Sequence, residues 1–335
     1  MNILLTSAGR RTYMIEYFKN ALSGSGEVHA SNSVLTYSLK QADRYVLTPQ
    51  IYSEGYIEFL KKYCIENKIS AIIPLFDIDL PILAKSKEVF KGIGVTVVVS
   101  DYYVTDICND KWQTYRFLES IGISQPASYI KIEDAKNALH NGDIAYPLYL
   151  KPRWGMGSLS IYKVDNDEEL DVLYRRIHRQ IFNSYLKFES SVDSDSCIII
   201  QQAIRGQEYG IEILNDMHGE YVATFAKVKI AMRAGETDIA ETVDSTPFEL
   251  IARKISKHLG HICNLDVDCF VDENNDIYIL EMNCRFGGQY PFTHNAGVNI
   301  PLQIIEWLKG HPTCMNLLSQ INGVKGSKDL VTYIF

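Results

Sequence analysis

The first hundred residues alternate between two hydrophobic patterns. Short apolar runs, which favour strands, are followed by stretches whose apolar residues recur at helical spacing. The strand-forming runs lie at 1–7, 27–31, 70–75 and 94–100, and the helical stretches lie at 10–22 and 56–68. Strands that alternate with helices over such a length predict a parallel, doubly wound α/β sheet.

A doubly wound sheet binds its ligands beyond the carboxyl ends of its strands. The polar residues that follow the expected strand ends are therefore this region's candidates for ligand contact: Ser7, Arg10, Arg11, Asp77 and Asp79. Of the two arginines we favour Arg10 as a residue that holds a second carboxylate. The alternative is that both arginines form a surface pair.

After residue 101 the chain becomes rich in strands. A helix is expected over 109–122, capped by Asn109 or Asp110 and ended by Gly122. Further helices are expected at 167–186, 247–259 and 301–310. The expected strands lie at 127–132, 146–152, 159–164, 197–204, 209–215, 221–231 and 276–283, with an edge strand at 330–335. These segments predict a second, differently built unit.

Length, composition and charge exclude several classes of protein. A chain of 335 residues usually forms two or three packed units. It contains no apolar run of about 20 residues, and its start lacks the order of a signal peptide, so we expect a cytoplasmic protein. Seven scattered cysteines without CxxC spacing predict reduced thiols. The net charge of -8 without a basic run argues against nucleic acid or a membrane surface as partner.

The first candidate site is the stretch YPLYLKPRWGMGSLSIY at 146–162. An apolar strand ends at Lys151, and a loop with spaced glycines leads back into another strand. The amides of Gly155, Met156, Gly157 and Ser158 can approach phosphate oxygens closely, while the lysine neutralises them. The alternative is a plain hairpin turn with a surface lysine.

The second candidate site is a predicted hairpin at 266–283, joined by the turn ENND. Glu281 and Asn283 are two residues apart and share one face of a strand, and the hairpin can bring Asp268 beside them. Three oxygen ligands suit Mg²⁺, which prefers a few protein oxygens plus substrate phosphates. A solvent-facing polar hairpin is the alternative.

The third candidate is an interrupted strand at 198–214, which turns at Arg205 and Gly206. Free backbone groups at the interruption can contact the edge of a purine, and Glu208 can accept hydrogen bonds from ribose hydroxyls. On its own this pattern is typical of any strand, turn and strand.

These three sites, in this order over about 175 residues, resemble the ATP-grasp superfamily. The segments TSAGRR, IIPLFDIDL, NDKWQTYRFLESIGISQP and EMNCRFGG are most similar to the ATP-grasp proteins related to the large subunit of carbamoyl-phosphate synthase. The resemblance implies a Rossmann-like preATP-grasp domain at 1–108, followed by a two-lobed ATP-grasp domain at 109–310. The smaller lobe would span about 109–190, the larger lobe 191–310, and a C-terminal segment 311–335.

The resemblance also implies roles for individual residues. Lys111 and Lys151 would bind the ATP phosphates, with the loop of Gly155, Met156, Gly157 and Ser158 closing over them. The adenine hinge would consist of Gln201, Gln202, Ala203 and Ile204, with Glu208 on the ribose. Mg²⁺ or Mn²⁺ would bind Asp268, Glu281 and Asn283. Arg285 would face the transferred phosphoryl group and the acyl substrate, and Lys229 and Arg233 match a basic stretch of the active site.

The sequence departs from the family pattern at two positions without losing a ligand atom. Gln201 stands where relatives often have Glu, and Cys284 replaces the usual proline. The absence of GxGxxG after the first strand disfavours a dinucleotide-dependent dehydrogenase.

The expected activity is that of an ATP-dependent carboxylate-amine ligase with an acyl-phosphate intermediate. Its partners would be a small carboxylic acid and an amine, and a homodimer stays open. Tyr290 and His294 would line the acceptor pocket or belong to the core. Two other functions remain open: phosphorylation of bicarbonate or carbamate, as in carbamoyl-phosphate synthase, and nucleotide binding without turnover.

Overall fold

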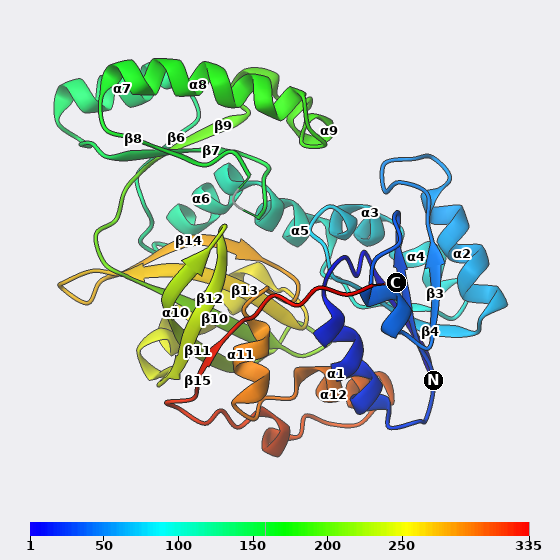
Figure 1. Cartoon of the computed structure of the whole chain (residues 1–335). Helices are drawn as coiled ribbons and strands as arrows, with labels where there is room; N and C mark the ends of the chain where they lie inside the picture. The colour runs from blue at the N-terminus through cyan, green and yellow to red at the C-terminus, as the bar shows by residue number, and fades with distance from the viewer. Residues whose placement is uncertain (158, 335) are drawn as a thin grey trace.

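The computed structural model describes residues 1–157 and 159–334. The chain forms an N-terminal α/β domain, a smaller lobe and a larger lobe (Figure 1). The smaller lobe lies above the other two parts, which pack side by side.

The N-terminal domain is built on a parallel sheet in the order β3-β2-β1-β4-β5. The strands are β1 (Asn2–Thr6), β2 (Val28–Asn32), β3 (Arg44–Leu47), β4 (Ile69–Pro74) and β5 (Thr96–Val97), and the helices are α1 (Thr12–Leu22), η1 (Ser38–Gln41), α2 (Tyr56–Glu66), α3 (Asp79–Lys85), α4 (Lys87–Lys91) and α5 (Tyr102–Asn109). This topology confirms the doubly wound sheet.

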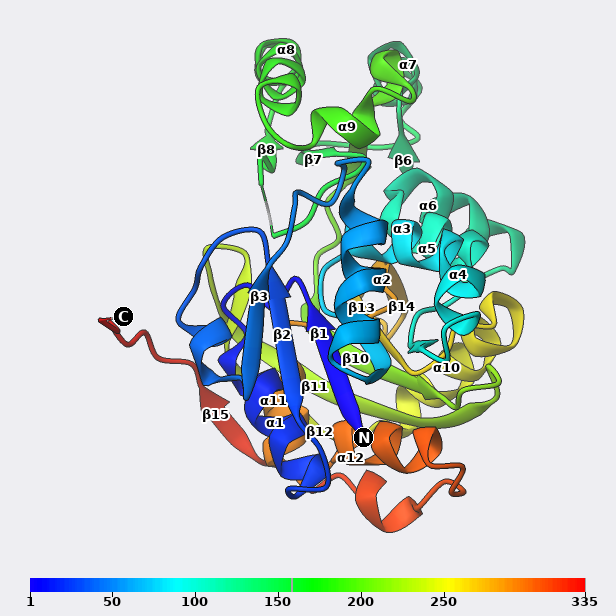
Figure 2. The ribbon, with the colours of Figure 1, turned by 90° about the vertical axis from the view of Figure 1, so that its right-hand side faces the viewer.

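Both faces of this sheet are buried, as expected of a parallel sheet covered by helices. Side chains alternate along β1, so Ile3 and Leu5 face the core of α1 while Leu4 faces the core of α2 and α3. Figure 2 shows helices on both sides of the blue strands.

The smaller lobe contains an antiparallel sheet in the order β6-β9-β7-β8. Its strands are β6 (Ser128–Tyr129), β7 (Leu148–Pro152), β8 (Tyr162–Val164) and β9 (Ile198–Gln202), and its helices are α7 (Ile132–Asn141), α8 (Asp167–Phe182), α9 (Lys187–Ser190) and η2 (Ser194–Ser196). In Figure 1 the long helices α7 and α8 lie above this sheet, leaving its lower side toward the larger lobe. Helix α6 (Lys111–Ser120) connects this lobe to the N-terminal domain.

The larger lobe contains an antiparallel sheet in the order β14-β13-β10-β11-β12-β15. The strands are β10 (Gln207–Asn215), β11 (Tyr221–Arg233), β12 (Glu236–Val243), β13 (Asn264–Val271), β14 (Ile277–Asn283) and β15 (Lys325–Ser327), and the helices are α10 (Thr246–Leu259), α11 (Tyr290–Asn295), α12 (Ile300–Leu308) and η3 (Met315–Leu318).

Two of the three hydrophobic cores are shared between the N-terminal domain and the larger lobe. One combines Leu4 with Val267, and the other combines Ile3 with Phe286 and Ile304. The third core lies within the smaller lobe and includes Leu150 and Ile177. The N-terminal domain and the larger lobe therefore form one packed body, to which the smaller lobe is attached.

The structure corrects several expected elements. The edge strand of the larger sheet is β15, and residues 330–334 of the expected strand at 330–335 are in no strand, while Phe335 lies outside the described residues. The strand expected at 94–100 is reduced to the two residues of β5. Helix α7 and strand β12 were not expected, because the segment 132–141 is polar except for a narrow apolar stripe and β12 is rich in charged residues.

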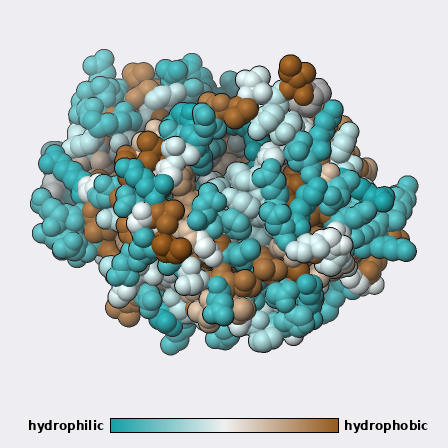
Figure 3. Space-filling view, turned by 60° about the horizontal axis from the view of Figure 1, so that its bottom comes forward, coloured by the Kyte–Doolittle hydropathy of each residue, from teal (hydrophilic) through white to brown (hydrophobic). Residues whose placement is uncertain are grey.

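Apolar side chains on the surface lie scattered among hydrophilic ones on the face shown in Figure 3. All seven cysteines are free thiols, and only Cys314 is exposed. Among the described residues, no helix is both long enough and apolar enough to cross a membrane.

Candidate active site

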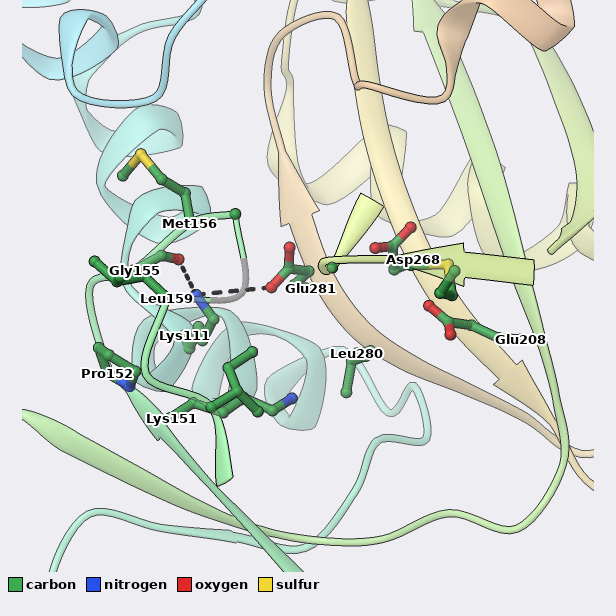
Figure 4. Close-up of a pocket in the computed structure, with 14 residues that line it drawn as sticks. Lys111, Lys151, Pro152, Gly155, Met156, Leu159, Glu208, Asp268, Leu280 and Glu281 are labelled. Atoms are coloured by element: carbon green, nitrogen blue, oxygen red, sulfur yellow. Dashed lines mark hydrogen bonds and ion pairs between the residues drawn. The ribbon is translucent and has the colours of Figure 1, made fainter. Parts of the chain in front are cut away.

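A pocket lies where the loop after β7 faces the sheet of the larger lobe (Figure 4). The smaller lobe and α6 supply one wall, and strands β10, β11, β13 and β14 with the turn after β11 supply the other. The lining residues are Lys111, Lys151, Pro152, Gly155, Met156, Gly157, Leu159, Ile161, Glu208, Met232, Gly235, Asp268, Leu280 and Glu281. Eight of these are residues that the sequence predicts for the site.

Lys151 occupies β7 and is only 7% exposed. Its Nζ donates a hydrogen bond of 2.8 Å to Oε1 of Gln201 on the neighbouring strand β9. Among the described residues, no carboxylate lies within 4 Å of this Nζ. The pKa of Lys151 is lowered to about 8, mainly by burial. Glu281 opposes this shift, and the nearby cation Lys111 adds to it. A buried ammonium group whose only direct partner is a neutral amide is suited to an anionic ligand.

Lys111 begins α6 and meets both walls of the pocket. Its Nζ donates a hydrogen bond to the carbonyl of Gly155, and it lies 3.7 Å from Oε2 of Glu281 (Figure 4). The lysine thus links the glycine loop to the larger lobe.

Asp110 and Arg153 form a buried ion pair that fixes the positions of Lys111 and Lys151 relative to each other. The carboxylate of Asp110 caps α6 by accepting from the backbone N–H of Trp112, at 2.9 Å. It also accepts hydrogen bonds from Nε and Nη2 of Arg153, at 2.8 and 2.7 Å, and both side chains are buried. Because Asp110 precedes Lys111 and Arg153 follows Lys151 by two residues, this bidentate pair fixes the distance between the phosphate-binding candidates.

The opposite wall presents carboxylates that already have a cationic partner. Asp268 on β13 lies directly opposite Glu281 on β14. Lys229 on β11 bridges Asp268 and Glu208, with Nζ 2.6 Å from Oδ1 of the first and 2.8 Å from Oε1 of the second. The hairpin that the sequence predicts is therefore present, and Lys229 joins its Asp268 to Glu208 on the neighbouring strand β10.

The two hairpin carboxylates differ in their acidity. Burial raises the pKa of Asp268 to about 6, although Lys229 opposes the shift. Burial also acts to raise the pKa of Glu281, but the charges of Lys111 and Lys151 outweigh it and the pKa is lowered. Asn283 donates to Oε1 of Glu281 at 3.3 Å, which leaves its own carbonyl oxygen available. The side chains of all three predicted metal ligands thus lie close together.

Arg285 lies behind the pocket and joins the larger lobe to the N-terminal domain. Its Nε is 2.9 Å from Oδ1 of Asp77, and its Nη1 is 2.8 Å from Oδ2 of Asp266. Asp77, which the sequence places after a strand end, follows β4 and contacts Arg285. The guanidinium group is nevertheless occupied by two carboxylates and does not line the pocket.

Several predicted residues lie outside the pocket lining. The hinge residues Gln201, Gln202, Ala203 and Ile204 run from the end of β9 into the connection to β10 and are not part of the lining. Arg233 pairs with Asp238 at 2.5 Å near the end of β11 and likewise does not line it. Ser158 lies outside the described residues. Among the described residues, the polar partners of the Arg233 side chain are Asp238 and the carbonyl of Lys328.

Tyr290 belongs to the core, and His294 packs beside it at partial burial. The hydroxyl of Tyr290 is buried, donates to the carbonyl of Val298 and accepts from the backbone N–H of Ile300, both at 3.0 Å. His294 stacks on Tyr17 with ring centroids 3.6 Å apart.

Gln289 is a buried residue of this region that sequence reasoning did not single out. Its Nε2 donates to Oδ1 of Asp266 at 2.7 Å and to Oδ1 of Asp268 at 3.0 Å. A Cβ atom on Gly210 would lie 1.7 Å from Oε1 of Gln289, and one on Gly287 would lie 2.2 Å from the carboxylate of Asp266. A larger residue at either position would displace the side chain of Gln289 or Asp266, so the two glycines leave room for this close packing.

Fold and site together define a two-lobed α/β protein whose pocket, lined by lysines and carboxylates, lies between two antiparallel sheets. A family model described as an ATP-grasp domain matches residues 108–289, more than half of the chain. The chain therefore belongs to the ATP-grasp family. A second model, described as a PylC-like N-terminal domain, matches residues 3–98.

Comparison with individual proteins gives distant relatives. The carbamoyl-phosphate synthase of Methanobrevibacter smithii is 24% identical over 300 residues, covering 83% of this chain and 74% of the relative. The carbamoyl phosphate synthase large chain of Campylobacter jejuni is 23% identical over 82% of this chain, which spans only 26% of that relative. The crystal structure of an L-amino acid ligase from Bacillus licheniformis is similar with a TM-score of 0.76 and 19% identity, over 99% of this chain and 81% of the other.

Proposed function

We propose that this protein is an ATP-dependent carboxylate-amine ligase that acts through an acyl phosphate. The observation that carries the proposal is the buried Lys151, whose ammonium group has only a neutral amide as its direct partner among the described residues. A polyphosphate supplies the anion that this environment lacks. Membership of the ATP-grasp family and the likeness to an L-amino acid ligase support the same activity.

The proposed roles follow from the positions of the side chains. Lys111 and Lys151 hold phosphate oxygens of ATP, and the loop of Gly155, Met156 and Gly157 covers them. We place Ser158 in this loop from the sequence alone. Glu208 binds the ribose, with the adenine in the hinge at 201–204. Lys111 donates to the carbonyl of Gly155 in this structure, and this hydrogen bond must weaken when Lys111 binds the nucleotide.

The donor set of the hairpin fits Mg²⁺ or Mn²⁺. Asp268, Glu281 and Asn283 offer only oxygen ligands, and Mg²⁺ is usually bound by one or two carboxylates together with substrate phosphates. Among the described residues, no group of three or more His, Cys, Asp or Glu side chains is arranged to hold a metal ion. The proposed set has two carboxylates and one amide, and the substrate phosphates would complete it. When bound, the ion neutralises charge on the phosphates.

The reaction has two steps. A carboxylate oxygen of the acid attacks the γ-phosphorus of ATP, the bond to the β-phosphate oxygen breaks, and ADP leaves. The amine nitrogen then attacks the carbonyl carbon, the bond to the phosphate oxygen breaks, and the nitrogen loses a proton. Lys151 stabilises charge on the transferred phosphoryl group, and the closed pocket excludes water. Family resemblance assigns Arg285 to the transferred phosphoryl group and the acyl substrate, and it places Lys229 and Arg233 in a basic stretch of the active site.

A screen with ATP, Mg²⁺ and a library of amino acids and small carboxylic acids tests the proposal. One acid should trigger ADP release, and hydroxylamine should trap its acyl phosphate as a hydroxamate. The carbamoyl-phosphate synthase relatives favour a second candidate, phosphorylation of bicarbonate. Release of ADP with bicarbonate alone would replace the first activity by the second, and binding of ATP without any release would leave a non-catalytic nucleotide-binding module.

A further inference from the structure

Arg11 is a cation near the site without an anionic partner. It directly precedes α1, and its Nη1 donates a hydrogen bond of 2.7 Å to the carbonyl of Phe286, the residue after Arg285. Among the described residues, no carboxylate lies within 4 Å of its guanidinium nitrogens. The other N–H groups of this side chain are therefore available to a ligand. Arg10, by contrast, is exposed.

A second cation reaches the same place from the C-terminal segment. Lys328 follows β15, and its Nζ lies 3.8 Å from the position that a Cβ atom on Gly288 would take. Its one ion pair among the described residues is long, at 3.5 Å, and joins it to Glu236, whose side chain is 61% exposed. Figure 1 shows the red C-terminal segment running from β15 across to the N-terminal domain, where Tyr333 stacks on Tyr37.

The two cations act on each other. Burial lowers the pKa of Lys328, and the charge of Arg11 lowers it further, although Glu236 opposes the shift. Like charges that are held close together are costly unless an anion lies between them. Positive charge and unused donors thus gather around residues 286–288.

We propose that Arg11 and Lys328 form, with the loop at 286–288, a binding site for a second negatively charged group on the substrate. This inference rests on the proposed ligase function, because the site adjoins Arg285. The substrate then carries one carboxylate that is phosphorylated and another anionic group, a carboxylate or a phosphate. Lys328 lies beyond residue 289, where the match to the ATP-grasp model ends.

Direct binding tests the site without turnover. Succinate and inorganic phosphate are titrated by calorimetry into the protein saturated with a non-hydrolysable ATP analogue and Mg²⁺, so that Lys111 and Lys151 are occupied. We expect one of these anions to bind, and Arg11→Gln and Lys328→Gln to weaken it by about 10- to 100-fold, the range of a lost charge-assisted hydrogen bond. Binding of succinate alone indicates a second carboxylate, and binding of phosphate alone indicates a phosphate group.

Lys325→Gln is the matched control, because Lys325 is an exposed lysine on β15, the short strand that Lys328 follows. Absence of binding by both anions, or equal loss of affinity in Lys325→Gln, overturns the site. A turnover arm compares glutamate with glutamine and succinate with its monoamide in ADP release. If the only active acids carry a single negative charge, the ligase function stands and the second anion site is wrong. If no acid releases ADP, the ligase function fails, and calorimetry still decides the anion site.

Discussion

At Lys151 the protein keeps an ammonium group buried beside a neutral glutamine. Removing an ion from water without a counterion is costly, and the lowered pKa of this lysine expresses that cost. The position is therefore electrostatically prepared for a ligand with several negative charges.

We expect Lys151→Met to raise the Kd of ATP by about 10- to 100-fold, because a charge-assisted contact to the phosphates is lost while the volume of the side chain is kept. Calorimetry with Mg-ATP measures this change. Lys163→Met, in the same lobe, is the control, since Lys163 is half exposed and pairs with Asp165. Equal ATP affinity in wild type and Lys151→Met would remove the lysine from the nucleotide site.

Glu281 combines a pocket position with a lowered pKa. Glu281→Gln keeps the shape and one oxygen but removes the negative charge, so ATP should still bind while kcat falls by about 10²- to 10³-fold. The measurement is ADP release across a Mg²⁺ titration, once an acid substrate is known. Turnover at the wild-type rate with an unchanged Mg²⁺ response would reduce the hairpin to a structural role.

Arg285 provides the comparison for Glu281. Its removal would leave the buried carboxylates of Asp77 and Asp266 without a partner, so Arg285→Ala tests folding as well as catalysis. Arg285→Lys retains the charge and loses the bidentate geometry. It should lower the rate and leave the Mg²⁺ dependence unchanged. A shifted Mg²⁺ dependence in this variant would contradict the assignment of the arginine to the acyl substrate.

At the scale of elements, the start of α6 and the end of β7 act together. Asp110 caps the helix and holds Arg153 in a buried pair, so one carboxylate supports the placement of both phosphate-binding lysines.

We expect Asp110→Asn to lower the free energy of unfolding by about 3 to 5 kcal/mol, because it leaves a buried arginine without its main partner. It should also weaken ATP binding, since Lys111 and Lys151 are no longer held in register. Asp193→Asn is the matched control. Asp193 contacts the same guanidinium group at 2.9 Å but is 42% exposed, so its loss should cost less than about 1 kcal/mol. Equal free energies of unfolding for the two variants in urea denaturation would contradict this role of the Asp110–Arg153 pair.

At the scale of the whole molecule, the distribution of the cores separates a large body from a small one. The N-terminal domain and the larger lobe share two cores, and the smaller lobe has its own. The pocket lies between these bodies, so a change in their separation opens or closes it.

The large body also contains a histidine that makes stability depend on pH. His261 is fully buried, and its Nε2 faces the carbonyl of Ile213 at 3.1 Å while its Nδ1 faces the amide nitrogen of Asn215 at 3.5 Å. A proton on Nδ1 would point at another donor. Burial lowers the pKa of His261 to about 4, from an ordinary value of 6.5.

Because the unfolded chain binds this proton more readily, stability should be lost as the pH falls from about 6.5 toward 4. A shift of this size corresponds to about 3 kcal/mol. His261→Gln can still donate to Ile213 and does not titrate, so its unfolding free energy should fall less steeply over the same range. Denaturant unfolding at several pH values provides the measurement, and parallel curves for wild type and variant would rule out His261 as the source.

The sequence by itself determined the fold class and identified eight of the residues that line the pocket. The spacing of apolar residues distinguished the doubly wound sheet, where strand and helix patterns alternate, from the strand-rich unit. This spacing reflects local backbone geometry. The strand end at Lys151 and the paired positions of Glu281 and Asn283 follow from the same local rules. The domain borders at 108 and 310 remain predictions.

Only the tertiary structure decided which charges meet. Lys229 pairs with Asp268 through the order of strands in the larger sheet, and Arg285 pairs with Asp77, 208 residues away, through the packing of two domains. The same packing brings Arg11 and Lys328 to the loop at 286–288. Such pairs depend on strand order and domain contact, which no local pattern encodes. The sequence therefore indicates which residues can carry the chemistry, and the fold determines which partners control them.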